Sequence, residues 1–475
     1  MRILTTLVLF GFVLTLSAQD SLQVSLDDVL ELAKRNHPII KQADLQDQFA
    51  EAEIRAAKGT LDPKLQSSFN RKEYGGSEYY SKFYNSLKIP VWFPIDPKIE
   101  AYRNSGEHLN EENYVSSSSD YWQFTAGVSL PLGKGLFIDE RRTLIKQAKI
   151  YSEIAEAEKI KLTNKALFTI VKAYWEWYFA FKQFELMEQS MEIAEEIFKR
   201  VKLDYEYGEA AVVDTVQAKI TYQNRRADYI NSKVQLNSAK LALSIHLWSN
   251  EGLPLEIPEG SSPGSSSTQW IVPADSTLNK IVTWATDNHP EVKKVSAKQA
   301  QYEVEQQWNR ESLKPQLDLS YNFIDAPISY SGFEPIDIGE NYKIGMDFSF
   351  PLLLRKERGK LQKTKLYVES LEYDYMQTQQ QVGAQIRSVF VELLANQELT
   401  TQYLDLSRNY QRLLEAEIFN VENGESDLFK LNIQQDKFIE AQIKYLKVQI
   451  TFEKLKAELP YVAGLPYLSY LKMYD

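Results

Sequence analysis

The chain has 475 residues, a formal net charge of -11 at pH 7 and no cysteine. The excess of acidic residues argues against a nucleic-acid-binding surface, which needs a basic stripe to displace counterions. Without cysteine the chain has no disulfide, no thiolate nucleophile and no zinc–thiolate site.

Residues 1–19 are typical of a secretory signal peptide. Met1-Arg2 gives a short basic start, the run from Ile3 to Leu16 is apolar, and Ser17-Ala18-Gln19 supplies small residues for cleavage. A buried N-terminal helix is the alternative. No later stretch has the roughly 18 uncharged apolar residues that a transmembrane helix needs. We therefore predict an exported protein without a membrane-spanning helix.

The remaining chain is a duplication. Residues 26–41 recur almost in register 252 positions later, so that Asn36-His37-Pro38 corresponds to Asn288-His289-Pro290. One structural unit used twice predicts a pseudo-symmetric scaffold. The first repeat covers 20–249, a flexible Gly- and Ser-rich linker covers 250–275, and the second repeat covers 276–475.

Each repeat begins with a helix of moderate length. Ser25 is the predicted N-cap of the first helix, and Thr277 is the predicted N-cap of its counterpart. Pro38 and Pro290 lie inside these helices, where proline removes a backbone hydrogen bond, so we expect a break or kink at each.

Two segments in each repeat then alternate between apolar and polar residues, as half-buried strands do. The predicted strands cover about 63–74, 121–132, 315–326 and 340–352. One apolar face opposite a polar face suits a transmembrane β-barrel, and the edge of a soluble sandwich is the alternative. The positions expected to face lipid are Phe124, Val128, Leu317, Leu319, Tyr342, Ile344, Phe348 and Phe350.

The first repeat carries an insertion, between Tyr74 and Tyr121, that the second repeat lacks. Its richness in Tyr, Asn, Ser, Gly and Pro is typical of a long extracellular loop between barrel strands. Residues 88–92 and 99–102 leave open whether it also contains a further hairpin.

Two long helices follow the strands in each repeat. The segment from Arg141 to Tyr205 has neither Pro nor Gly, which predicts a helix of about 95 Å. Its apolar and aromatic residues recur mostly at spacings of three and four, which indicates a coiled-coil seam. A turn near Gly208 leads to a second helix ending about Trp248. In the second repeat, helices over 357–421 and 426–458 flank a turn near Gly424.

Four strands cannot close a barrel, because membrane barrels begin at about eight strands and an open edge cannot sit in lipid. Several copies must therefore combine their strands, giving eight from two copies or twelve from three. The predicted fold is an α+β membrane protein, built from a duplicated helix–strand–strand–long helix–helix unit.

The duplicated order of these motifs resembles the TolC-like outer membrane factor family, over nearly all of the mature chain. The resemblance implies a homotrimer, with a twelve-stranded β-barrel in the outer membrane of a Gram-negative bacterium, continuous with a long α-helical coiled-coil barrel in the periplasm. Its implied function is the channel of a tripartite efflux or type I secretion system. Its implied partners are a periplasmic adaptor (membrane fusion) protein and an inner-membrane RND or ABC-type transporter.

The resemblance also implies site residues at the two helix turns. Tyr205-Glu206-Tyr207-Gly208 matches the periplasmic tip turn of the family, and Val421-Glu422-Asn423-Gly424 is its counterpart. Some members constrict the tunnel with acids six and nine residues after the second glycine, where this chain has Lys430 and Ile433. The expected tip, gate and adaptor contacts are Asp204, Tyr205, Gly208, Glu209, Asp214, Glu422, Gly424, Glu425 and Asp427. The acids among them, with Glu206, would form a negative ring when repeated by symmetry, and solvated charges without a role are the alternative.

Catalysis is not expected. The chain has four histidines and shows no His-x-x-x-His motif, phosphate loop or nucleophile elbow. We expect no catalytic residue, no cofactor and no metal. A non-conducting periplasmic coiled-coil scaffold or adaptor is the alternative function; it explains the helices but not the two-faced strands. The cargo is open between drug, metal and protein.

Overall fold

The structure is a computed structural model, and it describes residues 23–109, 122–264, 272–324, 341–423 and 425–466. The predicted signal peptide lies outside these residues. The chain divides into two compact units. The first comprises residues up to 41, 163–278 and 386 onward, and the second comprises 42–162 and 279–385. Each unit contains segments of both repeats, so units and repeats are different divisions of the chain.

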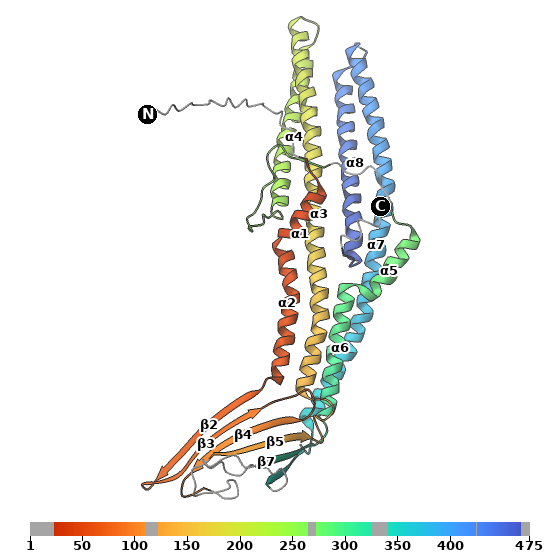
Figure 1. Cartoon of the computed structure of the whole chain (residues 1–475). Helices are drawn as coiled ribbons and strands as arrows, with labels where there is room; N and C mark the ends of the chain where they lie inside the picture. The colour runs from red at the N-terminus through yellow and green to blue at the C-terminus, as the bar shows by residue number, and fades with distance from the viewer. Residues whose placement is uncertain (1–22, 110–121, 265–271, 325–340, 424, 467–475) are drawn as a thin grey trace, which may run out of the picture. The chain divides into compact units, whose positions relative to one another are not determined.

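The first unit is almost entirely helical. It contains α1 (Leu26–Asn36), α4 (Val212–Ser244) and α8 (Leu428–Val462). It also holds the C-terminal parts of α3 (Glu140–Glu206) and α7 (Arg355–Glu422). Helix α4 lies beside α3, and α8 lies beside α7 (Figure 1). These bounds differ from the predicted helices by a few residues.

The core of this unit forms where the predicted seam of α3 meets its neighbours. Ile170, Tyr174 and Trp177 are at most 1% exposed, and they cluster with Leu243 of α4 and Ile450 of α8. Burying such large side chains contributes about 1.5–3 kcal/mol each, so the aromatic stripe stabilises the helix packing.

The helix starts follow the local sequence. The Ser25 hydroxyl accepts a hydrogen bond from the Asp28 amide at 3.1 Å, as predicted for an N-cap. Helix α1 stops at Asn36 and α2 (Pro38–Lys58) begins at the proline, so the chain breaks there. The cap prediction at Thr277 is wrong. Helix α5 (Asp275–Asn288) starts two residues earlier and makes Thr277 a residue of its first turn.

Part of the predicted flexible linker is packed rather than free. Strand β6 (Ser262–Pro263) pairs in parallel with β1 (Gln23–Val24), and Ser261 is 1% exposed. A Cβ atom on Gly264 would lie only 3.2 Å from the Ser25 Cα, so glycine allows this close approach. The Gly and Ser composition therefore permits a tight contact here and does not produce a loose chain.

The second unit combines helices with one antiparallel sheet. Its helices are most of α2 and α5, all of α6 (Pro290–Glu311), and the N-terminal parts of α3 and α7. The short 3-10 turn Gly59–Leu61 leads from α2 into the first strand. The Asn309 amide of α6 donates to the Thr364 hydroxyl of α7 at 2.7 Å, and both side chains are buried.

No helix of the described ranges is both long enough and apolar enough to cross a membrane.

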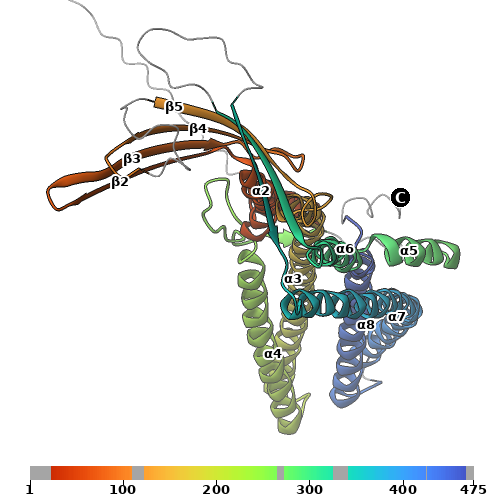
Figure 2. The same ribbon diagram turned by 90° about the horizontal axis from the view of Figure 1, so that it is seen from below.

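The sheet contains six strands in the order β2-β3-β4-β5-β7-β8, and it is strongly curved (Figure 2). All neighbouring strands are antiparallel. The strands are β2 (Lys64–Tyr74), β3 (Ser77–Lys88), β4 (Asp96–Ser105), β5 (Trp122–Pro131), β7 (Gln316–Ile324) and β8 (Tyr342–Ser349).

The number of strands differs from the prediction of four. Strands β2, β5, β7 and β8 overlap the four predicted segments, and β3 and β4 form the further hairpin that the sequence of the insertion left open. The sequence did not decide between loop and hairpin, because Ser81 and Asn85 interrupt the apolar alternation of β3. The sheet of one chain thus has six strands, two more than the four per chain from which twelve strands for three copies were counted.

Candidate functional site

The predicted lipid-facing residues lie on one face of the sheet. The pairing of β7 with β8 places Leu317 opposite Phe348 and Tyr321 opposite Ile344. The pairing of β7 with β5 places Tyr321 opposite Val128. Because side chains alternate along a strand, these pairs and their neighbours two residues away share a face. Phe124, Leu319 and Tyr342 follow the same alternation, and Phe350 continues it directly after β8.

This apolar face is open to its surroundings. The side chains of Ile344 and Phe348 are 59% and 67% exposed, although both are large and apolar. A contiguous exposed apolar surface of this kind marks a contact with lipid or with another protein.

The opposite face of the sheet is polar and internally bonded. Glu100 of β4 is 6% exposed and accepts hydrogen bonds from the hydroxyls of Tyr84 and Tyr102, each at 2.6 Å. The Thr125 hydroxyl of β5 donates to the same carboxylate at 3.1 Å, and Lys98 forms an ion pair with it. The network joins three neighbouring strands, so a buried carboxylate is fully partnered on this face.

The first helix turn connects α3 and α4. Gly208 has φ of +80°, which glycine adopts without steric cost, and its amide bonds to the Tyr205 carbonyl at 3.0 Å. The amide of Glu209 bonds to the carbonyl of half-buried Asp204 at 2.8 Å. The Asp214 carboxylate accepts a hydrogen bond from the Ala211 amide at 3.2 Å, which satisfies a backbone donor at the start of α4.

The second helix turn connects α7 and α8. Gly424 and the side chain of Glu422 lie outside the described part of the chain. The amide of exposed Glu425 bonds to the Asn420 carbonyl at 2.8 Å. Asp427 is the N-cap of α8, and its carboxylate accepts from the Lys430 amide at 2.9 Å.

Two of the predicted tip acids, Asp214 and Asp427, thus serve local helix starts. An N-cap such as Asp427 typically contributes about 1 kcal/mol, and both acids place negative charge at the positive end of a helix dipole. The sequence reasoning missed the apolar side chains beside them. Tyr207, Val213 and Phe429 are 80%, 66% and 61% exposed, and exposed β-branched or aromatic residues at a helix start could have signalled a contact surface.

Helices α4 and α8 are joined by a polar contact between the two repeats. Arg225 of α4 is 8% exposed and forms an ion pair with Asp436 of α8. Nearby, the Asn432 amide donates to the Thr221 hydroxyl at 3.0 Å. These bonds hold the two helical hairpins of the first unit together.

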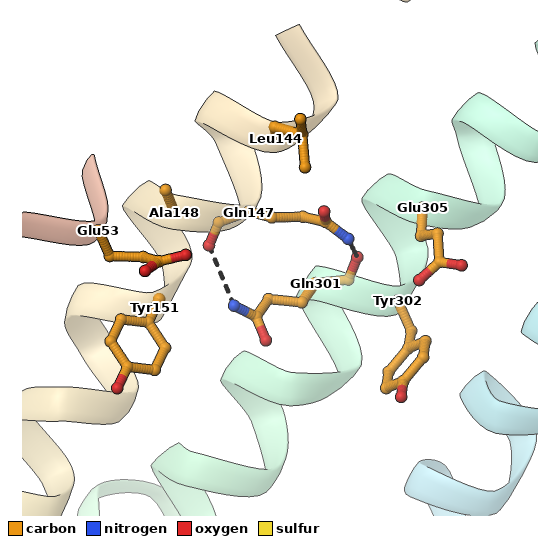
Figure 3. A pocket seen from close by; sticks show the side chains of 8 residues that line it. All are labelled: Glu53, Leu144, Gln147, Ala148, Tyr151, Gln301, Tyr302 and Glu305. Atoms are coloured by element: carbon orange, nitrogen blue, oxygen red, sulfur yellow. Dashed lines mark hydrogen bonds between the residues drawn. The ribbon is translucent and has the colours of Figure 1, made fainter. Parts of the chain in front are cut away.

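A groove of about 460 Å³ in the second unit is lined by Gln147 of α3 and Gln301 of α6, with Glu53 and Glu305 nearby (Figure 3). Each glutamine amide donates to the backbone carbonyl of the other residue, at 3.2 Å and 3.0 Å. The amides are therefore used in joining α3 to α6. Glu53 and Glu305 are equivalent positions of the two repeats, and no nucleophile–base pair is visible in Figure 3.

Within the described ranges, no group of three or more His, Asp or Glu side chains is arranged to hold a metal ion.

Comparison with known proteins gives a match to one family model over part of the chain and a shared fold over nearly all of it. The family described as outer membrane efflux protein matches residues 29–246. The Campylobacter jejuni CmeC outer membrane channel is 15% identical, with a TM-score of 0.67 over 94% of this chain and 88% of that chain. The open-state MtrE outer membrane channel of Neisseria gonorrhoeae is 14% identical, with a TM-score of 0.65 over 93% of this chain and 89% of that chain.

The outer membrane protein VceC of Vibrio cholerae is likewise 14% identical, with a TM-score of 0.64 over 93% of this chain and 96% of that chain. A search of curated proteins finds no match.

The curved two-faced sheet and the long helical hairpins thus form the fold that these outer membrane channels share. The matched family model and the shared fold agree with the resemblance to the TolC-like outer membrane factor family.

Proposed function

We propose that this protein is the outer membrane channel of a tripartite efflux system or of a type I secretion system. Three copies enclose a water-filled path through the outer membrane and the periplasm. The chain itself carries out no chemical step, so the energy for transport comes from an inner-membrane RND or ABC-type transporter.

The observation that carries the proposal is the two-faced sheet. Its apolar face exposes large side chains such as Phe348, whereas its polar face holds hydrogen-bonded groups around Glu100. A membrane barrel needs this arrangement, with apolar residues toward lipid and polar residues toward the lumen. A soluble periplasmic scaffold does not explain an apolar sheet face that is exposed.

The two helix turns are the proposed contact with a periplasmic adaptor. The proposed surface combines acids, including Glu209 and Glu425, with the exposed apolar residues Tyr207, Val213 and Phe429. Repeated by threefold symmetry, the acids form a negative ring. An adaptor with basic and apolar residues at its own tip fits this surface, because opposite charges steer encounter and apolar contact provides affinity.

Membrane fractionation followed by native mass measurement of the detergent-solubilised protein tests the channel itself. We expect the protein in the outer membrane fraction with the mass of a trimer. A soluble monomer or dimer in the periplasm would contradict the channel and favour the non-conducting scaffold.

The adaptor contact has a matched test on α4. Val213 and Val234 are both exposed, at 66% and 60%, but only Val213 lies at the turn. Val213→Asp should reduce adaptor binding and transport at least tenfold and leave the trimer intact, whereas Val234→Asp should change neither. Equal effects of the two substitutions would show that the turn is not the contact.

A further inference from the structure

Strands β3 and β4 are built into the middle of the sheet. In the strand order they stand between β2 and β5, and β2 has its described pairing with β3 alone. Strand β3 pairs with β2 over eleven positions and with β4 over eight. In the described sheet, β2 is joined to the remaining strands through the inserted hairpin, so the hairpin is part of the wall and not an appendage.

The inserted strands carry the same two faces as the rest of the sheet. Leu87 lies opposite both Leu65 of β2 and Ile99 of β4, and Ala101 lies opposite Phe124 of β5. These residues continue the apolar face into the hairpin, where the polar side chains of Asn85 and Arg103 interrupt it. On the other face, Ser86 and Glu100 lie opposite each other and belong to the polar side.

The hairpin also has the dimensions of a membrane segment. Strands β3 and β4 contain 12 and 10 residues, and a tilted strand needs about 9–11 residues to cross the hydrocarbon core. The connection between them exposes Trp92 and Phe93, at 42% and 70%. Aromatic residues at the end of a barrel strand are typical of the membrane–water interface.

An ion pair fixes the hairpin to the helical part of the second unit. Asp96, the first residue of β4, contacts Arg141 in the first turn of α3 at 2.8 Å and Lys88 at the end of β3 at 3.0 Å. The Ile89 amide bonds to the Pro97 carbonyl at 2.9 Å. The base of the hairpin is thus held where the sheet meets the helix.

The two edges of the sheet are suited to each other. Strand β2 leads away from the helices and β8 leads back to them, so β2 of one copy can pair with β8 of the next in antiparallel orientation. Within the described residues, the outer edges of both strands have no strand partner. Lipid does not tolerate unpaired backbone groups, so the wall must close.

We propose that copies of this chain join β2 to β8, and that three copies close an eighteen-stranded barrel in place of the twelve strands implied by the resemblance. The inference rests on the proposed trimeric channel. Barrels of 16–18 strands enclose an aqueous channel, and their diameter grows roughly in proportion to strand number. The exit of this channel is therefore about one and a half times as wide as a twelve-stranded exit.

Engineered cysteine pairs test the interface, because the chain has no cysteine of its own. Gln66→Cys on β2 is combined in turn with one of three substitutions on β8: Lys343→Cys, Gly345→Cys or Asp347→Cys. The three β8 positions lie on the same face of the sheet as Gln66, and each tests a different register between β2 and β8. We expect at least one pair to form covalent trimers in the outer membrane on oxidation. Ser129→Cys with Ser320→Cys, opposite each other on β5 and β7, is the control that should crosslink only within one chain.

The competing arrangement is a twelve-stranded barrel in which β4 of one copy meets β8 of the next. Lys98→Cys on β4, combined with the same three β8 positions, tests it. Crosslinking through Lys98→Cys, or failure of every β2–β8 pair in a membrane trimer, would overturn the inference and leave the proposed channel standing. Cryo-electron microscopy of the unmodified trimer gives the strand count directly, and twelve strands would also overturn the inference. A protein that is absent from the outer membrane would instead contradict the proposed function.

Discussion

At the scale of single residues, a pair of histidines links the start of α2 to the end of α4. His37 Nε2 lies 3.3 Å from His246 Nδ1, and the rings stack with centroids 5.6 Å apart. Burial lowers the pKa of both side chains, and the neighbouring His246 lowers the pKa of His37 further. The folded protein therefore favours the neutral form of the pair.

This pair predicts a loss of stability in acid. An unfolded histidine has a pKa of about 6.5, so below that pH the unfolded chain binds more protons than the folded chain. The free energy of unfolding therefore falls as the pH falls from about 6.5 to the lowered pKa of the folded pair. Thermal unfolding of the protein should show a drop in Tm between pH 7.5 and pH 5.5. Replacing His37 and His246 by asparagine should shrink the drop, with His108→Asn as the control. An unchanged pH dependence in the double variant would contradict the prediction.

The sequence indicated that His37 is structural, because His289 occupies the equivalent position before a proline. It gave no signal for His246, since the two side chains are 209 positions apart and meet only through the packing of α1 and α4. The same limit applies to Asp214 and Asp427. Their acidity was visible in the sequence, but their hydrogen bonds to amides at the helix starts depend on where each helix begins.

At the scale of elements, Arg225 and Asp436 join the helical hairpins of the two repeats. Asp436 is largely exposed, so solvent screens the pair and we expect a coupling free energy of about 1 kcal/mol or less. A double-mutant cycle with Arg225→Met and Asp436→Asn measures it.

In the proposed channel, loss of this contact should also loosen the two helix turns and increase uptake of a large antibiotic. Glu440→Gln is the control, because Glu440 pairs with Lys444 inside one helix. No change in uptake for Asp436→Asn would show that the contact does not keep the turns closed.

The faces of β8 provide a second prediction for an element. Phe348→Asp places a charge on the apolar face and should cost roughly 2–4 kcal/mol if that face meets lipid at the membrane midplane. Assembly of the outer membrane trimer should then fail. Lys343→Asp lies on the polar face of the same strand and should assemble normally. Normal assembly of Phe348→Asp would show that this face does not contact lipid.

Long helices and strands with clean alternation could be predicted, because their patterns extend over many residues. Strands β3 and β4 could not be assigned, because Ser81, Asn85 and Arg103 stand among the apolar positions and weaken the period of two. Pairing with neighbours on both sides stabilises these strands, and that pairing is not encoded within the insertion alone.

At the scale of the whole molecule, the inserted hairpin predicts the conductance of the channel. Deleting residues 75–105 removes two antiparallel strands per copy, so β2 can pair with β5 and the wall can still close with twelve strands. Because diameter follows strand number, the open cross-section and the single-channel conductance should fall to about half. A hairpin outside the wall would leave the conductance unchanged.

The antiparallel order of the sheet has a consequence for how such channels diverge. A single extra strand would reverse the direction of one edge and prevent neighbouring copies from joining, whereas a hairpin leaves both edges as they were. Lineages can therefore widen the exit only in steps of one hairpin per gene, which adds six strands to a threefold assembly. The insertion lies between β2 and β5 of the first repeat. A single local duplication can therefore enlarge the proposed pore, while the helix turns of the proposed adaptor contact keep their sequence.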